Sequence, residues 1–141
     1  MDVLTKKQRS YCMSRIRSKD TSPEKAVRSE LHKHGLRFRK HVISLPGKPD
    51  IVLSRYKLVI HVRGCFWHGH NCADGHIPKT RKTYWEPKLK ANKNRDKRND
   101  RKLRQLGWSV LTLWECNCVN PHRLSREISR IRKHVEKKLL S

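Results

Sequence analysis

Three short apolar runs limit the folds open to this chain more than any other feature of its sequence. Two of them, Ile51–Leu53 and Lys57–Val62, stand on either side of Ser54-Arg55, and the third spans Trp108–Trp114. Short runs rich in Val, Ile and Leu are typical of strands that are covered on both faces. We therefore expect these three segments to form the core of a sheet.

A helix is predicted before the first of these strands. Ser22 can cap a helix N-terminus, Pro23 suits the first helical position, and Glu24 places an acid in the first turn, where the helix dipole favours it. Gly35 can then end the helix, since glycine readily adopts the left-handed conformation that follows a last turn.

Two more helices are predicted in the second half of the chain. The basic stretch Lys88–Leu106 follows Pro87, after which we expect the helix to begin, and Gly107 can end it. From Leu124 to Leu140, apolar residues recur every three or four positions, as in an amphipathic helix.

Charge narrows the classes of partner. The chain has 141 residues with 35 Lys or Arg against 12 Asp or Glu, a net charge of +23. This length suits a single domain over residues 1–141, with residues 1–19 as a basic arm or helix. Such an excess favours a polyanionic partner, nucleic acid first and an anionic membrane second. The sequence has neither a run of about 20 apolar residues nor the apolar core of a signal peptide, so we expect a cytosolic protein.

A loop rich in cysteine and histidine follows the second strand. Cys65, His70 and Cys72 lie within eight residues, and Cys116 or Cys118 can add a fourth soft ligand from the end of the third strand. Five cysteines is an odd number, which fits a disulfide framework poorly. We expect a closed structural zinc site, because an irregular loop without an apolar core needs an organising element. The alternative is buried cysteines and a solvated histidine.

Aromatic residues in and after this loop suggest contact with bases. Phe66, Trp67 and Trp85, with Met13 in the N-terminal arm, could stack on bases or wedge between base steps. Core packing explains Phe66 and Trp67 equally well on spacing alone. For the tryptophans that bound the third strand, Trp108 and Trp114, we expect core packing.

Acidic residues are sparse, and Asp50 stands out because it ends a turn and begins a buried strand. A carboxylate there is tolerable if it holds Mg²⁺, which phosphodiester hydrolysis uses to polarise phosphate and activate water. Glu24, His68 and Asp96 could complete such a site. Taken singly, each has a simpler explanation: a capping Asp, a dipole-compensating Glu, a solvated His and an Asp paired with arginine.

Five segments together resemble the very short patch repair endonucleases, the Vsr family. The resemblance runs from about Met13 to Cys116, and the Cys-Phe-Trp-His-x-His-x-Cys block is its most specific part. It implies an α/β, restriction-endonuclease-like fold of the PD-(D/E)XK type, with a mixed central sheet, flanking helices and a structural zinc loop. It also implies an enzyme that nicks duplex DNA 5′ of the thymine in T:G mismatches left by deamination of 5-methylcytosine. The segments are PGKPD (46–50), GCFWHGHNC (64–72), PKTRKTYW (78–85), NKNRDKRND (92–100) and LGWSVLTLWEC (106–116).

The resemblance implies a role for each candidate residue. Asp50 corresponds to the Mg²⁺-binding aspartate, His68 to the catalytic histidine, and Glu24 and Asp96 to carboxylates that order metal-bound waters or the histidine. The remaining matches are the zinc ligands Cys65, His70, Cys72 and Cys116, the major-groove aromatics Phe66, Trp67 and Trp85, the minor-groove wedge Met13, and Lys88 and Asn92 near the mismatch.

One dipeptide departs from the family pattern, which has Thr-His before the Gly-Cys where this chain has Val62-Arg63. Val62 can still offer its backbone carbonyl to Mg²⁺, and Arg63 can replace the histidine's charge at the phosphate but not its acid–base role. We expect Asp50 and the Val62 carbonyl to hold Mg²⁺ while His68 accepts a proton from water.

The sequence is also compatible with two other functions: a non-catalytic zinc-containing nucleic-acid-binding module, and a restriction-type nuclease of different specificity. The resemblance favours a bacterial, nucleoid-associated monomer whose partner is T:G-mismatched duplex DNA. We expect no membrane partner. It leaves open an interaction with mismatch-repair proteins.

Overall fold

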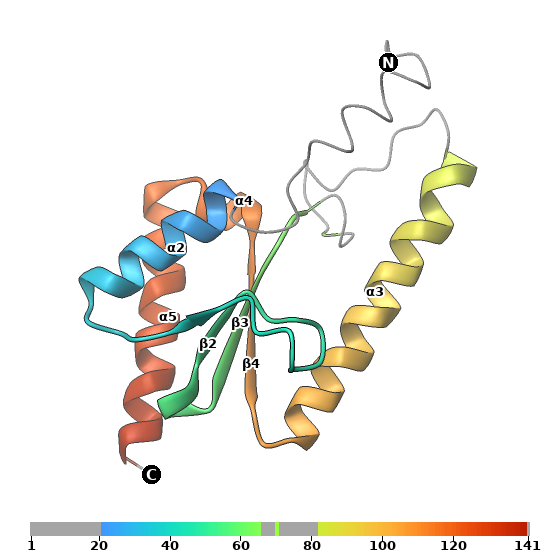
Figure 1. Ribbon diagram of the computed structural model, residues 1–141. Helices are drawn as coiled ribbons and strands as arrows, with labels where there is room; N and C mark the ends of the chain where they lie inside the picture. The colour runs from blue at the N-terminus through green and yellow to red at the C-terminus, as the bar shows by residue number, and fades with distance from the viewer. Residues whose placement is uncertain (1–20, 66–69, 71–81, 141) are drawn as a thin grey trace.

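A four-stranded mixed sheet forms the centre of the molecule (Figure 1). The computed structural model describes residues 21–65, 70 and 82–140. The strands lie side by side in sequence order, and the first three are antiparallel neighbours, whereas the last two are parallel. Their bounds are β1 (Arg39–Lys40), β2 (Ile51–Leu53), β3 (Leu58–Arg63) and β4 (Ser109–Trp114). The three predicted strands are confirmed to within one residue at either end.

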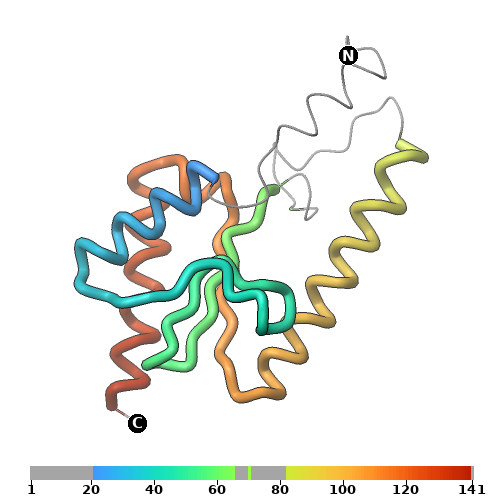
Figure 2. Tube along the Cα trace, viewed as in Figure 1, coloured from blue at the N-terminus to red at the C-terminus, as the bar shows by residue number. Residues whose placement is uncertain are grey.

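Helices cover both faces of the sheet. Helices α2 (Ser22–Lys33) and α5 (Pro121–Leu140) lie together on one side, and the long helix α3 (Lys82–Gln105) lies on the other, as the tube in Figure 2 also shows. Two short helical turns complete the described elements, η1 (Ser54–Tyr56) between β2 and β3 and α4 (Glu115–Cys118) after β4. The predicted α/β class is therefore confirmed.

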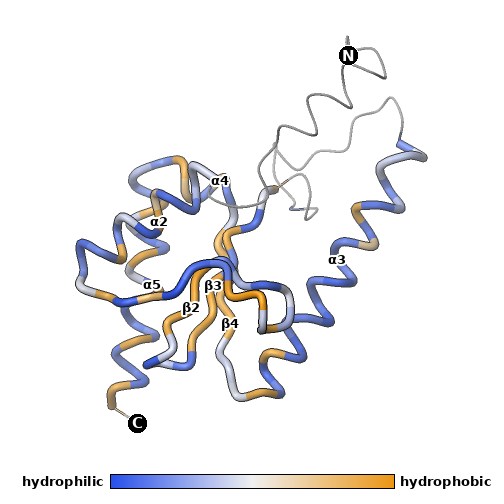
Figure 3. Tube along the Cα trace, in the orientation of Figure 1, coloured by the Kyte–Doolittle hydropathy of each residue, from blue (hydrophilic) through white to orange (hydrophobic). Residues whose placement is uncertain are grey.

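The core is divided by the sheet into two apolar clusters. Along β3, Leu58, Ile60 and Val62 join the larger cluster with residues of α2 and α5, while Val59 joins the smaller one with Leu103 of α3. Strands β2, β3 and β4 are accordingly mostly hydrophobic in Figure 3, whereas β1 and most of α3 are hydrophilic. Side chains alternate between the two faces along a strand. His61 and Arg63, two and four residues after Val59, therefore also lie on the α3 side.

The starts of three helices differ from prediction, and the simplest case is α5, which begins at Pro121, three residues before Leu124. Thr21, and not Ser22, caps α2, since its hydroxyl accepts a hydrogen bond from the Glu24 N–H at 3.4 Å. Helix α3 begins at Lys82, so the prediction of a start after Pro87 was wrong. A proline this close to a helix start removes only one backbone hydrogen bond, and the buried Trp85 lies in this first part of the helix.

The predicted helix stops are confirmed. Gly35 and Gly107 have φ values of 71° and 93°, the left-handed conformation that glycine adopts without a steric penalty. In the described part of the chain, no helix is long and apolar enough to cross a membrane.

Strand direction gathers the chemistry at one edge of the sheet. The carboxyl ends of the parallel strands β3 and β4 meet there, with Arg63 opposite Trp114. Strand β2 is antiparallel to β3 and pairs Ile51 with Ile60, so its amino end, preceded by Asp50, lies at the same edge. Open α/β sheets commonly bind ligands outside the carboxyl ends of their strands.

Candidate active site at the end of the sheet

Asp50 is held in place by the strand next to it. Its Oδ2 accepts a hydrogen bond from the Val62 N–H at 2.7 Å, and its backbone carbonyl accepts one from the His41 N–H at 3.0 Å. These bonds join the start of β2 to the end of β3 and to the residue after β1. The predicted proximity of Asp50 and Val62 is therefore present in the structure.

A second carboxylate, Glu24, reaches Asp50 from the first turn of α2. Glu24 is 1% exposed, and its Oε2 lies 3.6 Å from Nε2 of His41 and 3.7 Å from Nη1 of Arg28. One ligand atom each from Glu24, His41 and Asp50 lies within 4.8 Å of the other two. Two carboxylates and an imidazole at this spacing offer oxygen and nitrogen donors suited to a divalent cation.

Burial shifts the protonation of Asp50. The pKa of its carboxyl is raised from 3.8 to about 7, chiefly by burial away from water, with the charge and hydrogen bond of Glu24 acting in the same direction. The Val62 N–H and the positive charge of Arg63 act in the opposite direction. Two carboxyl groups in hydrogen-bond contact share a proton when no cation is bound, and a cation can take that proton's place.

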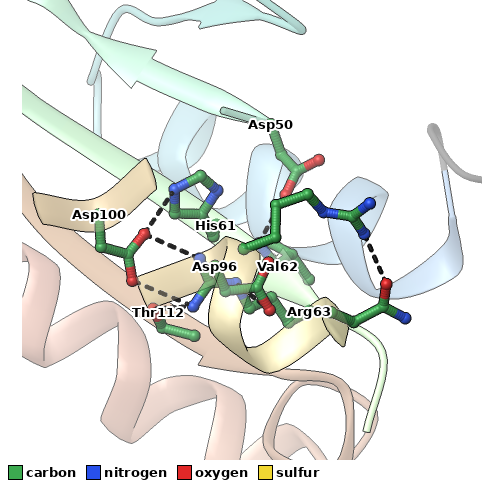
Figure 4. Close-up of polar contacts among 9 residues, drawn as sticks. Asp50, His61, Val62, Arg63, Asp96, Asp100 and Thr112 are labelled. Atoms are coloured by element: carbon green, nitrogen blue, oxygen red, sulfur yellow. Dashed lines mark hydrogen bonds and ion pairs between the residues drawn. The ribbon is translucent and has the colours of Figure 1, made fainter. Parts of the chain in front are cut away.

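On the other side of β3, Arg63 is bound to helix α3 (Figure 4). Its Nη2 lies 2.9 Å from Asp100 Oδ1 and its Nη1 donates to Asp100 Oδ2 at 3.3 Å, a two-point contact. The same Nη1 donates to the Thr112 hydroxyl at 3.3 Å, and Nε lies 3.9 Å from Asp96 Oδ2. The sequence indicated a phosphate contact for Arg63, but the structure shows its guanidinium engaged between β3 and α3.

A cavity of about 580 Å³ connects the two groups of residues. Asp96, which the resemblance places in the catalytic site, therefore opens into the same space as Asp50. The cavity walls come from the loop before β2, the end of β3 and the middle of α3, and include His41, Asp50, His61, Val62, Arg63 and Asp96.

The predicted zinc ligands form a second cluster at this edge. Cys65, His70 and Cys116 each place a ligand atom within 4.8 Å of the others, and Cys116 Sγ lies 3.6 Å from His70 Nδ1. In a tetrahedral zinc site, bonds of about 2.3 Å to sulfur and 2.0 Å to nitrogen put such atoms roughly 3.6 Å apart, so the three residues fit zinc. The Cys116 N–H donates to Cys65 Sγ at 3.4 Å, a geometry also seen around thiolates.

The structure distinguishes the two candidate cysteines of α4. Cys116 is in the cluster, whereas Cys118 is buried in the apolar core beside residues of α2 and α5. Burial raises the pKa of the Cys118 thiol to about 12, which disfavours the thiolate that zinc needs. Trp114 is half-buried and stacks on the His70 ring at 4.2 Å, so it packs against the cluster as well as bounding the strand.

Among the predicted DNA contacts on α3, Trp85 differs from expectation. Its side chain is 4% exposed, so the ring is covered in this structure and is not presented as a free aromatic surface. Lys88 is exposed, with its ammonium 4.3 Å from the Tyr84 ring centre, and the Asn92 side chain accepts from Arg95 Nη2 at 2.7 Å.

Five predicted site residues, Met13, Phe66, Trp67, His68 and Cys72, lie outside the described residues. Their assignments stay predictions.

Sequence reasoning missed two residues that the structure brings to this edge. His41 joins Glu24 and Asp50, and Asp100 receives Arg63. His41 sits in a segment with no clear periodicity, and the spacing of Asp100 from Asp96, one helical turn, was the only signal available for it.

Comparison with known proteins identifies relatives over most of the chain. Residues 1–74 match the family model described as DNA mismatch endonuclease Vsr. The type II nicking enzyme V.XorIIP of Xanthomonas oryzae pv. oryzae is 52% identical over 130 residues, covering 92% of this chain and 96% of that protein. DNA mismatch endonuclease Vsr of Escherichia coli K12 is 43% identical over 126 residues, covering 89% and 81%. The type II nicking enzyme V.NmeAIP of Neisseria meningitidis is 41% identical over 135 residues, covering 96% of each chain.

Proposed function

The chain belongs to the Vsr family of DNA mismatch endonucleases, and on that premise we propose that it nicks duplex DNA 5′ of the thymine in T:G mismatches. The family shows that the protein is a DNA endonuclease; the mismatch, the cations and the repair role are our proposal. The observation that carries it is the carboxyl pair of Glu24 and Asp50, whose oxygens lie within 4.8 Å of each other at the edge where β3 and β4 end.

The fold we propose is restriction-endonuclease-like. Its support is the position of Asp50 directly before an antiparallel strand pair, with its carboxylate bound by the backbone at the end of the second strand. This geometry puts the Asp50 carboxylate beside the backbone of Val62, the residue whose carbonyl we propose as a Mg²⁺ ligand. It is the arrangement that the family resemblance implies for Asp50 and Val62.

Asp50, Glu24 and the Val62 carbonyl are the groups that we propose hold Mg²⁺. When bound, this cation would polarise the scissile phosphate and lower the pKa of a water molecule. The chain's own contribution is to orient Asp50: the Val62 N–H fixes Oδ2, and this hydrogen bond together with the charge of Arg63 partly offsets the rise in the pKa of Asp50 that burial causes. We assign proton acceptance to His68 and the ordering of this histidine to Asp96.

Zinc has a structural role in this proposal. Cys65, His70 and Cys116 meet at the ends of two strands that are far apart in sequence, and Cys72 would be the fourth ligand. A site without an open position ties the loop after β3 to the sheet and performs no chemistry. DNA contact is assigned to Met13, Phe66 and Trp67, with Lys88 and Asn92 on α3.

Strand mapping tests the proposed function. A duplex with one T:G pair, labelled on both strands, is incubated with the protein and Mg²⁺ beside a matched duplex and a sample with EDTA. We expect one nick, on the thymine strand and 5′ of the mismatched thymine, and no nick in either control. Equal cleavage of the matched duplex would instead indicate a nuclease of different specificity.

A further inference from the structure

His41 adopts an unusual backbone conformation at the candidate active site. Its φ is 49°, in the left-handed region that side chains other than glycine rarely adopt. The conformation is held by two backbone hydrogen bonds, from the His41 N–H to the Asp50 carbonyl at 3.0 Å and from the Val42 N–H to the Pro49 carbonyl at 3.3 Å. A left-handed conformation is unfavourable for a residue with a Cβ, so the surrounding loop must compensate for it.

The side chain of His41 lies beside the two carboxyl groups. Its Nε2 is 3.6 Å from Glu24 Oε2, and one ligand atom from each of His41, Glu24 and Asp50 falls within a 4.8 Å limit. His41 also lines the cavity that Asp50 and Asp96 share. The imidazole is therefore placed where it can act on whatever the carboxyl pair binds.

The donor set differs from that of an all-oxygen magnesium site. Mg²⁺ binds carboxylates, carbonyls and water in near-octahedral geometry, whereas first-row transition ions accept imidazole nitrogen readily. We propose that His41 is a nitrogen ligand of the cation held by Asp50 and Glu24, so that Mn²⁺ binds more tightly than Mg²⁺. This inference rests on the proposed function in one respect, the placement of a cation at Asp50.

Electron paramagnetic resonance of Mn²⁺ tests the inference without DNA and without a measurement of nicking. The technique counts unbound Mn²⁺ during a titration, and its pulsed form detects an imidazole nitrogen bonded to the ion. We expect the purified protein to bind Mn²⁺ with a nitrogen signal and to release it only to excess Mg²⁺. Thiolates are poor ligands for Mn²⁺, so the cysteine cluster does not interfere.

The central variant is His41→Asn, because asparagine tolerates a positive φ and keeps an oxygen donor. We expect the nitrogen signal to disappear and Mn²⁺ affinity to fall about tenfold or more, the loss typical of metal-site residues. Mg²⁺ affinity should change less than about threefold, since an oxygen donor suits that ion. If this variant does not fold, His41→Gly keeps the backbone freedom and removes the donor.

Lys57→Asn is the matched control. Lys57 also has a left-handed backbone, with φ 52°, and is exposed at the turn after η1, near the opposite end of β3. Replacing it with asparagine imposes the same backbone change away from the site, and both affinities should stay unchanged. Weaker Mn²⁺ binding in this variant as well would show that the His41 effect is conformational and would overturn the inference.

The outcomes separate this inference from the proposed function. A nitrogen signal that persists in His41→Asn, or no Mn²⁺ binding by the wild type at millimolar concentrations, overturns the inference, whatever the protein does to T:G duplexes. Loss of the signal in His41→Asn supports it even if those duplexes are not nicked. If Asp50→Asn binds Mn²⁺ as the wild type does, the cation is not at Asp50. Both the cation site of the proposed function and the inference about His41 are then wrong.

Discussion

At the scale of single residues, Asp50 has a property that can be measured without substrate. Burial raises the pKa of its carboxyl from 3.8 to about 7, so the folded protein keeps a proton that the unfolded chain releases near pH 4. The unfolded state therefore binds fewer protons than the folded state between about pH 4 and pH 7. The contribution of Asp50 to the free energy of unfolding is greatest below this range and decreases as the pH rises through it.

We predict that Asp50→Asn removes this decrease in the metal-free protein. The free energy of unfolding, measured by urea denaturation at pH 5 and pH 8, should fall more for the wild type than for the variant. Other carboxylates titrate in the same range, so the difference between the two proteins is the informative quantity. Equal pH dependence would mean that Asp50 is ionised in the folded protein throughout.

Arg63 is the second residue whose environment has a measurable consequence. Its contact with Asp100 joins β3 to α3 through side chains that are only 10% and 13% exposed. We predict that Arg63→Met destabilises the protein by about 3 kcal/mol, because it removes the arginine partner of the mostly buried Asp100 carboxylate and leaves, among the described residues, only the His61 ring, 3.5 Å away, beside it. Arg63→Lys should recover only part of this, since lysine keeps the charge but not the two-point geometry.

A double-mutant cycle with Asp100→Asn measures the Arg63 contact directly. The double variant should lose less stability than the sum of the two single variants, with a coupling of about 1 kcal/mol or more. Independent, additive losses would contradict a direct contact between β3 and α3 through these side chains.

At the scale of elements, the sequence was most informative where periodicity was strong. The three strands and the amphipathic helix α5, with its buried Ile128, Ile131 and Val135, follow directly from the apolar pattern. The start of α3 was misplaced because Pro87 is usually a boundary signal, yet here it lies inside the helix, two residues after the buried Trp85. Local signals cannot report such tertiary contacts.

The site residues, too, could be predicted only where local sequence features mark them. Asp50, Glu24 and the cysteines stood out through residue type, local position and the family resemblance. His41 could not be predicted, because its role depends on a left-handed backbone and on the pairing of β1 with β2. The Arg63–Asp100 contact depends on how α3 packs against the sheet, which no local pattern specifies.

The short helix α4 supplies a matched test of the zinc proposal. We predict one zinc ion per chain in protein purified without added metal, and its loss in Cys116→Ala, since the Cys116 sulfur is in the cluster. Cys118→Ala changes a cysteine two residues away that is buried in the core, and should retain the zinc. Mass spectrometry measures the zinc content of the two variants. Zinc lost equally from both would argue against Cys116 as a ligand.

At the scale of the whole molecule, positive charge is present on both sides of the sheet. Helix α3 carries ten Lys or Arg against three acids, and α5 carries seven against two. Only three side chains of α3, Trp85, Leu89 and Leu103, are buried, so most of its charge is exposed. A protein with this distribution binds DNA in part by releasing counterions from phosphates.

We predict that DNA affinity falls steeply with salt. If about six to ten phosphates are contacted, the slope of log affinity against log salt concentration should be about −5 to −9. Fluorescence anisotropy with a labelled duplex gives this slope. A value near −1 would contradict a surface that follows the duplex backbone.

The central claim is that the carboxyl pair at the edge of the sheet is the catalytic centre of a mismatch endonuclease. The most direct measurement is the single-turnover rate of nicking of a T:G duplex by the wild type and by Asp50→Asn, at protein concentrations that saturate the DNA. The account predicts that the wild type nicks the thymine strand, while the variant binds the same duplex as tightly or more tightly and leaves it intact. Nicking by Asp50→Asn at the wild-type rate would contradict the account and place the reaction elsewhere in the molecule.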